Sequence, residues 1–358
     1  MNTIVANTHS FVIGVDTHAK THTYSVLASN GEHLGTEAFP NTHAGRTRAI
    51  AWAARRTGGD LAALWVIEGI GSYGAQLARQ VGLASYRAVE AARMSRGERR
   101  GIGKSDPIDA RRIAAAVLPL AEEQLRTPRM DEGIRAAAQI LLTARDELTG
   151  ERTRAVNALT ALVRIADLGI DARHPLGAKK IAEISRWRPR EEDLGAATAR
   201  TEAVRLAKRI LALDAEITDN TNRINELVAA SPAAALIAET GIGPVTAATV
   251  LVAWSHPGRV RDEAAFAALA GVNPIPASSG NTTRHRLNRG GDRRLNRALN
   301  VIAMVRMVHH PRTRAYADRR RAEGKTDREI RRCLKRYLAR RLYRHLNTTA
   351  AELGVDGI

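Results

Sequence analysis

The stretch Phe11-Val12-Ile13-Gly14-Val15-Asp16 is an apolar run that ends on an acid. Its composition predicts a buried strand. A second apolar run, residues 61–67, ends in the same way on Glu68. A carboxylate at the end of a buried strand is costly unless something pairs with it. Asp16 and Glu68, at the two strand ends, are therefore candidate functional residues.

The pattern around these two runs predicts a mixed α/β region over about residues 10–118. Three strands joined by short turns come first, and helix then alternates with strand. This order is expected of a ribonuclease-H-like fold, in which acids collect at adjacent strand ends. The expected strands are 11–16, 23–28, 33–39, 61–68 and 84–89, and the expected helices are 44–56 and 73–81.

Two further acids, Asp106 and Asp109, open a helical pattern. At a spacing of three residues they share one helix face. Together with Asp16 and Glu68 they can converge on one strongly negative point, which a hard divalent cation with oxygen ligands would occupy. Metal-assisted attack on a phosphodiester follows as the expected chemistry. The basic, Gly-punctuated stretch 91–105 is predicted to be a mobile loop that delivers the acid pair.

Bulk composition restricts the class of partner. The chain has 358 residues and a formal charge of +18, which favours a polyanion, either a nucleic acid or a membrane surface. Cys333 is the only cysteine, so an intrachain disulfide and a Cys-based zinc site are excluded, and a cytoplasmic setting is expected. We expect no signal peptide, because the N-terminus lacks a basic region followed by a long apolar stretch. No apolar run reaches the length of a membrane span, and we expect no membrane partner.

The region from about 132 to 227 is expected to form long helices with one break near 169–189. Residues at alternating steps of four and three form a heptad seam with Asn220 as a polar member that would set register. One interpretation is a two-stranded coiled coil between subunits. The alternative is a hairpin in which the seam packs on the chain's own helix, residues 139–162. The seam residues are Leu206, Ile210, Leu213, Ile217, Asn220, Ile224 and Leu227.

Residues 232–310 contain two features that suit a phosphate backbone. The turn Gly241-Ile242-Gly243-Pro244 between two expected helices resembles a helix-hairpin-helix, whose backbone N–H groups bind phosphate without reading sequence. Its alternative is an ordinary helical corner. Further on, Ser278-Ser279-Gly280 precedes five arginines that could bind phosphate oxygens in bidentate fashion. The alternative is a Ser/Gly turn followed by a solvated basic segment.

The segment 312–344 has fourteen Lys/Arg against four Asp/Glu. Its pattern predicts a helix with an apolar stripe and a basic face. Such a helix fits a nucleic-acid backbone, and its alternative is a helix lying in a membrane interface.

Taken together, these motifs resemble the DEDD transposases of the insertion-sequence-110 family, the bridge-RNA-guided recombinases. The resemblance covers nearly the whole chain, and it rests on the order of the motifs more than on any one of them. The matching stretches are Gly14–Lys20, Ile67–Gly74, Gly103–Ala110, Gly241–Ala247, Ser278–Gly280 and Arg284–Arg294.

The resemblance implies a RuvC-like domain that holds Mg²⁺ and a C-terminal domain whose serine forms a covalent phosphoserine link to DNA. It also implies a structured bridge-type RNA that pairs with donor and target DNA, and homodimers that assemble into tetramers in the bacterial cytoplasm, at the nucleoid. Two rivals remain open: a junction-resolving nuclease of the same fold that uses water, and a non-catalytic nucleic-acid-binding protein. The expected domains are 1–131, 132–231, 232–310 and 311–358.

Carried over residue by residue, the resemblance assigns the metal and catalytic roles to the four acids and the nucleophile to Ser279. Ser278 leaves an ambiguity of one residue. The arginines that follow are expected to bind nucleic acid. The complete set is Asp16, Glu68, Asp106, Asp109, Ser279, Arg284, Arg286, Arg289 and Arg293.

Overall fold

The computed structural model of the chain describes residues 3–92, 105–129, 132–277 and 285–354. These residues fall into two compact units. The first contains the described residues of 3–129 together with 254–266, and the second contains 132–253 together with the described residues of 267–353. The predicted loop at 91–105 lies mostly outside the described residues. The sequence-based segments 132–231, 232–310 and 311–358 fall mainly within the second unit.

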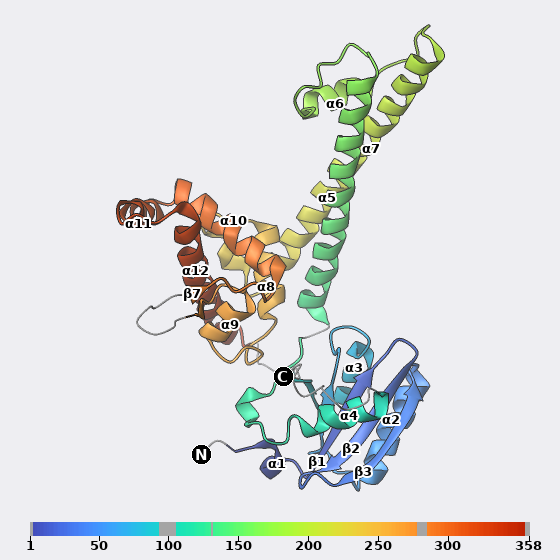
Figure 1. Cartoon of the computed structure of the whole chain (residues 1–358), viewed down its shortest axis with the longest axis vertical. Coiled ribbons are helices and arrows are strands. Elements are labelled where there is room, and N and C mark those ends of the chain that lie inside the picture. Colours follow the sequence, from blue (N-terminus) through green and yellow to red (C-terminus); the bar gives the residue numbers. More distant parts are fainter. Residues whose placement is uncertain (1–2, 93–104, 130–131, 278–284, 355–358) are drawn as a thin grey trace. The chain divides into compact units, whose positions relative to one another are not determined.

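The first unit is built on a mixed five-stranded sheet in the order β3-β2-β1-β4-β5 (Figure 1). β1, β2 and β3 pair antiparallel, and β4 and β5 add in parallel to β1. This is the arrangement of a ribonuclease-H-like fold, and all five predicted strands are confirmed, β4 and β5 being shorter than expected. The strands are Phe11–Thr17, Thr21–Ala28, His33–Pro40, Leu64–Ile67 and Arg87–Glu90.

Helices cover both faces of this sheet. Successive residues of β1 point to opposite faces, so the strand contributes apolar side chains to a core on each side. Ile13 and Val15 join a core with α2 (His43–Arg56) and α3 (Ala75–Leu83). Val12 joins a second core with α4 (Asp106–Ala115). Gly14 and Asp16 share the strand face of Val12, so Asp16 lies on the α4 side of the sheet. The unit also contains α1 (Val5–Thr8) and the 3₁₀ helix η2 (Glu122–Gln124).

The second unit begins with a long helical hairpin. α5 (Gly133–Ile165) and α7 (Leu194–Ala229) pack along each other, with α6 (Ala178–Ile184) between them in the chain (Figure 1). Four members of the heptad seam are buried, namely Ile210, Leu213, Asn220 and Ile224.

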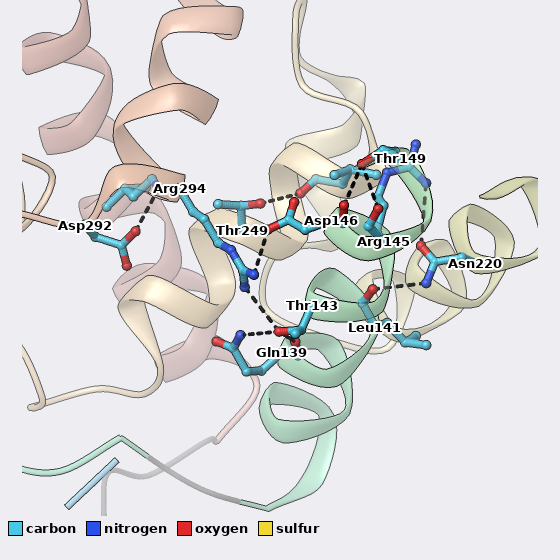
Figure 2. Close-up of polar contacts among 12 residues, drawn as sticks. Gln139, Leu141, Thr143, Arg145, Asp146, Thr149, Asn220, Thr249, Asp292 and Arg294 are labelled. Carbon is cyan, nitrogen blue, oxygen red and sulfur yellow. Dashed lines mark hydrogen bonds and ion pairs between the residues drawn. The ribbon is translucent and has the colours of Figure 1, made fainter. Parts of the chain in front are cut away.

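The seam is covered by the chain's own α5, as the Asn220 contacts show. Asn220 Nδ2 donates to the carbonyl oxygen of Leu141 at 3.0 Å, and Asn220 Oδ1 accepts from Arg145 Nη1 at 3.5 Å (Figure 2). The intramolecular alternative therefore describes the seam, and its assignment to a partner helix is corrected. Two helices of one chain, connected here by residues 166–193, meet at a smaller entropic cost than helices of two separate chains.

The rest of the second unit is mostly helical. The apolar stripe of α12 is buried at Ile330, Leu334, Leu338 and Leu342, and α12 packs on α10. The predicted stripe is thus used inside the protein rather than in a membrane interface. None of the described helices combines the length and apolarity that a membrane crossing needs. The elements are η3 (Ala234–Ala238), α8 (Pro244–Trp254), α9 (Glu263–Leu269), β6 (Ile275–Pro276), β7 (His285–Arg286), α10 (Arg293–His309), α11 (Pro311–Ala322) and α12 (Asp327–Glu352).

The Gly-Ile-Gly-Pro turn differs from the expected pair of α-helices, because a short 3₁₀ helix, η3, precedes it. Gly241 adopts φ +85°, and a Cβ atom there would lie 3.2 Å from the carbonyl oxygen of Ile302. Arg306 Nε donates to the carbonyl oxygen of Thr240 at 2.8 Å. The turn is therefore fixed against α10, and its phosphate-binding role remains a prediction.

Candidate metal centre

The sheet brings Asp16 and Glu68 to the same edge. β1 and β4 are parallel neighbours in which Val15 pairs with Ile67, and the Glu68 N–H donates to the carbonyl oxygen of Val15 at 3.0 Å. The next residue along the chain is Asp16 in β1 and Glu68 just past the end of β4. Strand pairing alone thus places two carboxylates at adjacent strand ends, as predicted.

Helix α4 supplies the other two acids from its first turn, which holds Asp106 and Asp109. The helix lies unusually close to β1 because Gly14 has no side chain. A Cβ atom on Gly14 would come within 2.2 Å of the carbonyl oxygen of Ala110 and 2.5 Å of the amide nitrogen of Ala114. This close approach sets the distance between the acids of the helix and those of the sheet.

Asp16, His18 and Asp106 together form a group that could hold a metal ion. Each offers one ligand atom, and these atoms lie within 4.8 Å of one another. His18 Nδ1 is 3.8 Å from Asp16 Oδ1. Asp16 is buried, whereas His18 and Asp106 are exposed, so the group is open on one side. An ion there would have protein ligands on one side and space for substrate or water on the other.

The electrostatics of this group favour a cation. Burial raises the pKa of Asp16, and the neighbouring carboxylates of Glu68, Asp106 and Asp109 raise the same pKa further, while His18 lowers it. Arg112 Nη1 lies 3.6 Å from Asp109 Oδ1 and offsets part of the negative charge. Carboxylate oxygens dominate the donor set, which fits a hard divalent ion, and one imidazole is compatible with it.

The predicted acids are thus brought together, but not equally. Asp106 joins Asp16 in the three-residue group, whereas Glu68 and Asp109 act on Asp16 through their charge. His18 was not predicted as a site residue. Its signal was present, because residues two apart at a strand end point to one face, and an acid followed two positions later by a histidine is a plausible ligand pair.

The predicted arginines that the structure describes belong to the second unit. Ser278, Ser279 and Arg284 lie outside the described residues. Arg286 in β7, Arg289 and Arg293 at the start of α10 are all exposed. Exposure is what a backbone-binding role requires, and the role itself stays a prediction.

Comparisons with known proteins agree with this arrangement of motifs. A family model described as Transposase, of the DEDD type, matches residues 13–166, and a second, described as Transposase IS116/IS110/IS902 family, matches residues 233–318. The chain is 30% identical to the insertion element IS900 uncharacterized 42 kDa protein of Mycobacterium paratuberculosis, with 87% of this chain and 89% of that protein covered.

Two further relatives come from Streptomyces. The insertion element IS110 uncharacterized 43.6 kDa protein of Streptomyces coelicolor is 27% identical, over 63% of this chain and 66% of that protein. The insertion element IS116 uncharacterized 44.8 kDa protein of Streptomyces clavuligerus is 29% identical, over 65% of this chain and 68% of that protein.

Proposed function

The chain belongs to the IS116/IS110/IS902 family of transposases, and we propose that it cuts and rejoins DNA at a Mg²⁺ centre held by Asp16, Glu68, Asp106 and Asp109. One observation carries the proposal. Asp16 is buried among carboxylates that raise its pKa, at a point where a ligand atom of Asp106 and one of His18 are also in reach. A divalent ion bound there would supply charge that stabilises a phosphoryl transition state.

The chain's own residues prepare this centre. Strand pairing fixes Asp16 and Glu68, and the contact of α4 with Gly14 fixes Asp106 and Asp109. His18 lies 3.8 Å from Asp16 and could ligate the ion or orient the carboxylate. Asp16 lies in a strand and Asp106 and Asp109 lie in a helix, and this placement on regular elements would limit the reorganisation that ion binding requires.

Ser279 is the proposed nucleophile. Its hydroxyl oxygen would form a bond to the phosphorus of a DNA phosphodiester, and the bond from phosphorus to the leaving sugar oxygen would break. The hydroxyl proton is lost and the leaving oxygen gains one, and the reverse attack by a sugar hydroxyl rejoins the strand and frees the serine. The family resemblance and the Ser278-Ser279-Gly280 sequence support this role.

A bridge-type RNA is the proposed source of sequence specificity. The arginine-rich composition suits phosphate backbones, and the sequence holds no recognisable helix-turn-helix or zinc finger for reading base edges. Base pairing would then choose the donor and target DNA, as it does in guided nucleases. Purified protein that selected its native target without RNA would contradict this.

Homodimers that assemble into tetramers remain part of the proposal, on the family resemblance alone. Because α5 covers the heptad seam, the subunit contact is expected elsewhere on the chain. Size-exclusion chromatography with light scattering, with and without RNA and DNA, measures the assembly directly.

Trapping the covalent intermediate tests the proposed chemistry. Denaturing gels of protein incubated with labelled DNA, RNA and Mg²⁺ should show an adduct that is absent in Ser279→Ala and in Asp16→Asn. Loss of the adduct in Ser278→Ala alone would move the nucleophile by one residue. Cleavage with free ends and no adduct would support a water-using nuclease, and unchanged activity in Asp16→Asn would support a protein whose acids are structural only.

A further inference from the structure

A two-stranded hairpin in the second unit is tied firmly at its base. Gly271, with φ +64°, and Gly291, with φ +91°, lie against each other so closely that a Cβ atom on Gly291 would be 2.7 Å from the amide nitrogen of Gly271. The Asp292 N–H donates to the carbonyl oxygen of Leu269 at 2.6 Å. β6 and β7 extend from this base.

Asn296 links the hairpin base to α12. Its Nδ2 donates to the carbonyl oxygen of Ala270 at 2.7 Å, and its Oδ1 accepts from Lys335 Nζ at 3.0 Å. The ammonium group of Lys335 is therefore held by a neutral amide rather than by a carboxylate. It is also half-buried, so this lysine has given up part of its hydration without forming an ion pair to any residue that the structure describes.

The charges around Lys335 increase this cost. Burial lowers the pKa of Lys335, and the neighbouring Arg332, Arg331 and Arg293 lower the same pKa further. Among the described residues, the charged groups that shift this pKa are all cations. Arg331 and Arg332 precede Lys335 by four and three residues on α12, and Arg293 lies one turn before Asn296 on α10, so the four positive side chains surround the Lys335–Asn296 contact. We call them the Lys335 cluster.

Nearby carboxylates have other partners. Asp327 accepts from Arg321 at 2.9 Å, Glu329 accepts from the N–H of Thr326 at 2.8 Å, and Asp292 caps α10 by accepting from the N–H of Leu295. Other arginines of α10 differ from the Lys335 cluster, because Arg294 pairs with Asp146 at 2.7 Å (Figure 2) and Arg306 pairs with Glu239.

We propose that Lys335, Arg293, Arg331 and Arg332 bind a backbone phosphate of duplex DNA beside the base of the β6–β7 hairpin. A phosphate supplies the missing negative charge, with arginines able to bind it in bidentate fashion and the lysine acting as a point charge. The choice of DNA rests on the proposed function, since the serine that would attack DNA lies in the sequence between β6 and β7.

Salt-dependent binding of a fluorescein-labelled DNA duplex, measured in EDTA without RNA, tests the site. Lys335→Gln removes the charge but keeps a donor for Asn296, whereas Lys335→Arg keeps the charge. Lys180→Gln is the matched control, because Lys180 is half-buried like Lys335 but already pairs with Glu183 at 2.8 Å. Lys335→Gln should weaken binding on the order of tenfold and reduce the slope of log affinity against log salt by about 0.9.

The controls should behave differently. Lys335→Arg should keep the parent's slope and Lys180→Gln should nearly keep it, while Arg332→Gln, at an exposed position that disturbs no packing, should reduce it as Lys335→Gln does. Equal slopes for Lys335→Gln and Lys180→Gln would overturn the site. A loss seen with an RNA hairpin probe but not with duplex DNA would overturn its assignment to DNA. If the parent forms no serine adduct yet keeps Lys335-dependent DNA binding, the proposed function fails and the site stands.

Discussion

Along the α5–α7 hairpin, charges on one helix meet opposite charges on the other, whereas at the sheet's strand ends carboxylates gather around Asp16. In the hairpin, Arg209 of α7 binds Glu151 of α5 at 2.8 Å, and Arg152 of α5 pairs with Asp214 of α7. The segment 132–231 has sixteen Lys/Arg against fifteen Asp/Glu, so it is close to neutral. Such matched charges can be explained by folding alone, whereas the unmatched acids point to a counter-charge from outside the chain.

The Lys335 cluster belongs with the strand-end acids in this respect, although its sign is opposite. The excess positive charge of segment 312–344 is concentrated where carboxylates are few. Whether a charged residue has an opposite charge beside it in the chain therefore indicates its function better than the net charge does. We expect that neutralising a matched charge lowers stability, while neutralising an unmatched one lowers binding or catalysis.

Asp16→Asn should give the largest effect and the sharpest contrast. DNA cleavage should fall on the order of a thousandfold or more, because the metal contributes several kcal/mol to the barrier. The melting temperature without metal should not fall, since a buried and repelled charge is removed. Mg²⁺ should raise the melting temperature of the parent but not of the variant, as differential scanning fluorimetry would measure. A large loss of metal-free stability would contradict the comparison.

Leu213→Ala tests the hairpin as a purely structural element. Leu213 is fully buried in the seam, so its truncation should cost about 2–5 kcal/mol in the free energy of unfolding. Leu211→Ala on the same helix is the control, because Leu211 is 37% exposed and should cost much less. Denaturant titration gives both values. Light scattering should report an unchanged mass for Leu213→Ala, and dissociation of an oligomer would restore the intermolecular seam.

Glu192→Gln tests a matched pair through its pH dependence. The hydrogen bond from buried Arg200 lowers the pKa of Glu192. A carboxylate with a lowered pKa stabilises the folded state above its ordinary pKa, and this contribution is lost as pH falls through the lowered value. The melting temperature of Glu192→Gln should therefore lie below the parent's at neutral pH and approach it in acid. Glu202→Gln, in an exposed pair with Arg205, should show a smaller gap at neutral pH.

The smallest effect is expected at the contact between α5 and α10. Arg294 and Asp146 are 38% and 48% exposed, so solvent screens their ion pair (Figure 2). A double-mutant cycle of Arg294→Gln and Asp146→Asn should give a coupling of about 0–1 kcal/mol. A much larger coupling would mean that this pair sets the geometry of the second unit and is more than a surface contact.

The sequence allowed the sheet and its acids to be predicted because period-two and apolar-run patterns are local. The strand ends at Asp16 and Glu68 follow from such patterns, and so does the helix start at Asp106. The partner of the heptad seam could not be predicted, because the apolar pattern that includes Ile210 and Leu213 is the same whether the seam packs on α5 or on a helix of another chain. Likewise, charge alone could not separate Lys335 from Arg294, since only the fold decides which cation meets a carboxylate.

His18 was not predicted for a different reason. It lies within the motif from Gly14 to Lys20, but a histidine beside a turn can have many roles. Only its distance from Asp16 and Asp106 in the structure indicates that it could be a metal ligand. The role of Ser278 and Ser279 could not be predicted from residue patterns, because no apolar periodicity surrounds them. The assignment of the nucleophile therefore rests on the family resemblance.

Gly14 gives a way to judge related genes. A methyl group at this position would collide with the backbone of α4, so even alanine would push Asp106 and Asp109 away from the strand ends. A relative that keeps all four acids but carries valine here should be an inactive copy. Intact carboxylates therefore do not identify a working element by themselves, and the missing side chain opposite them is part of the signature.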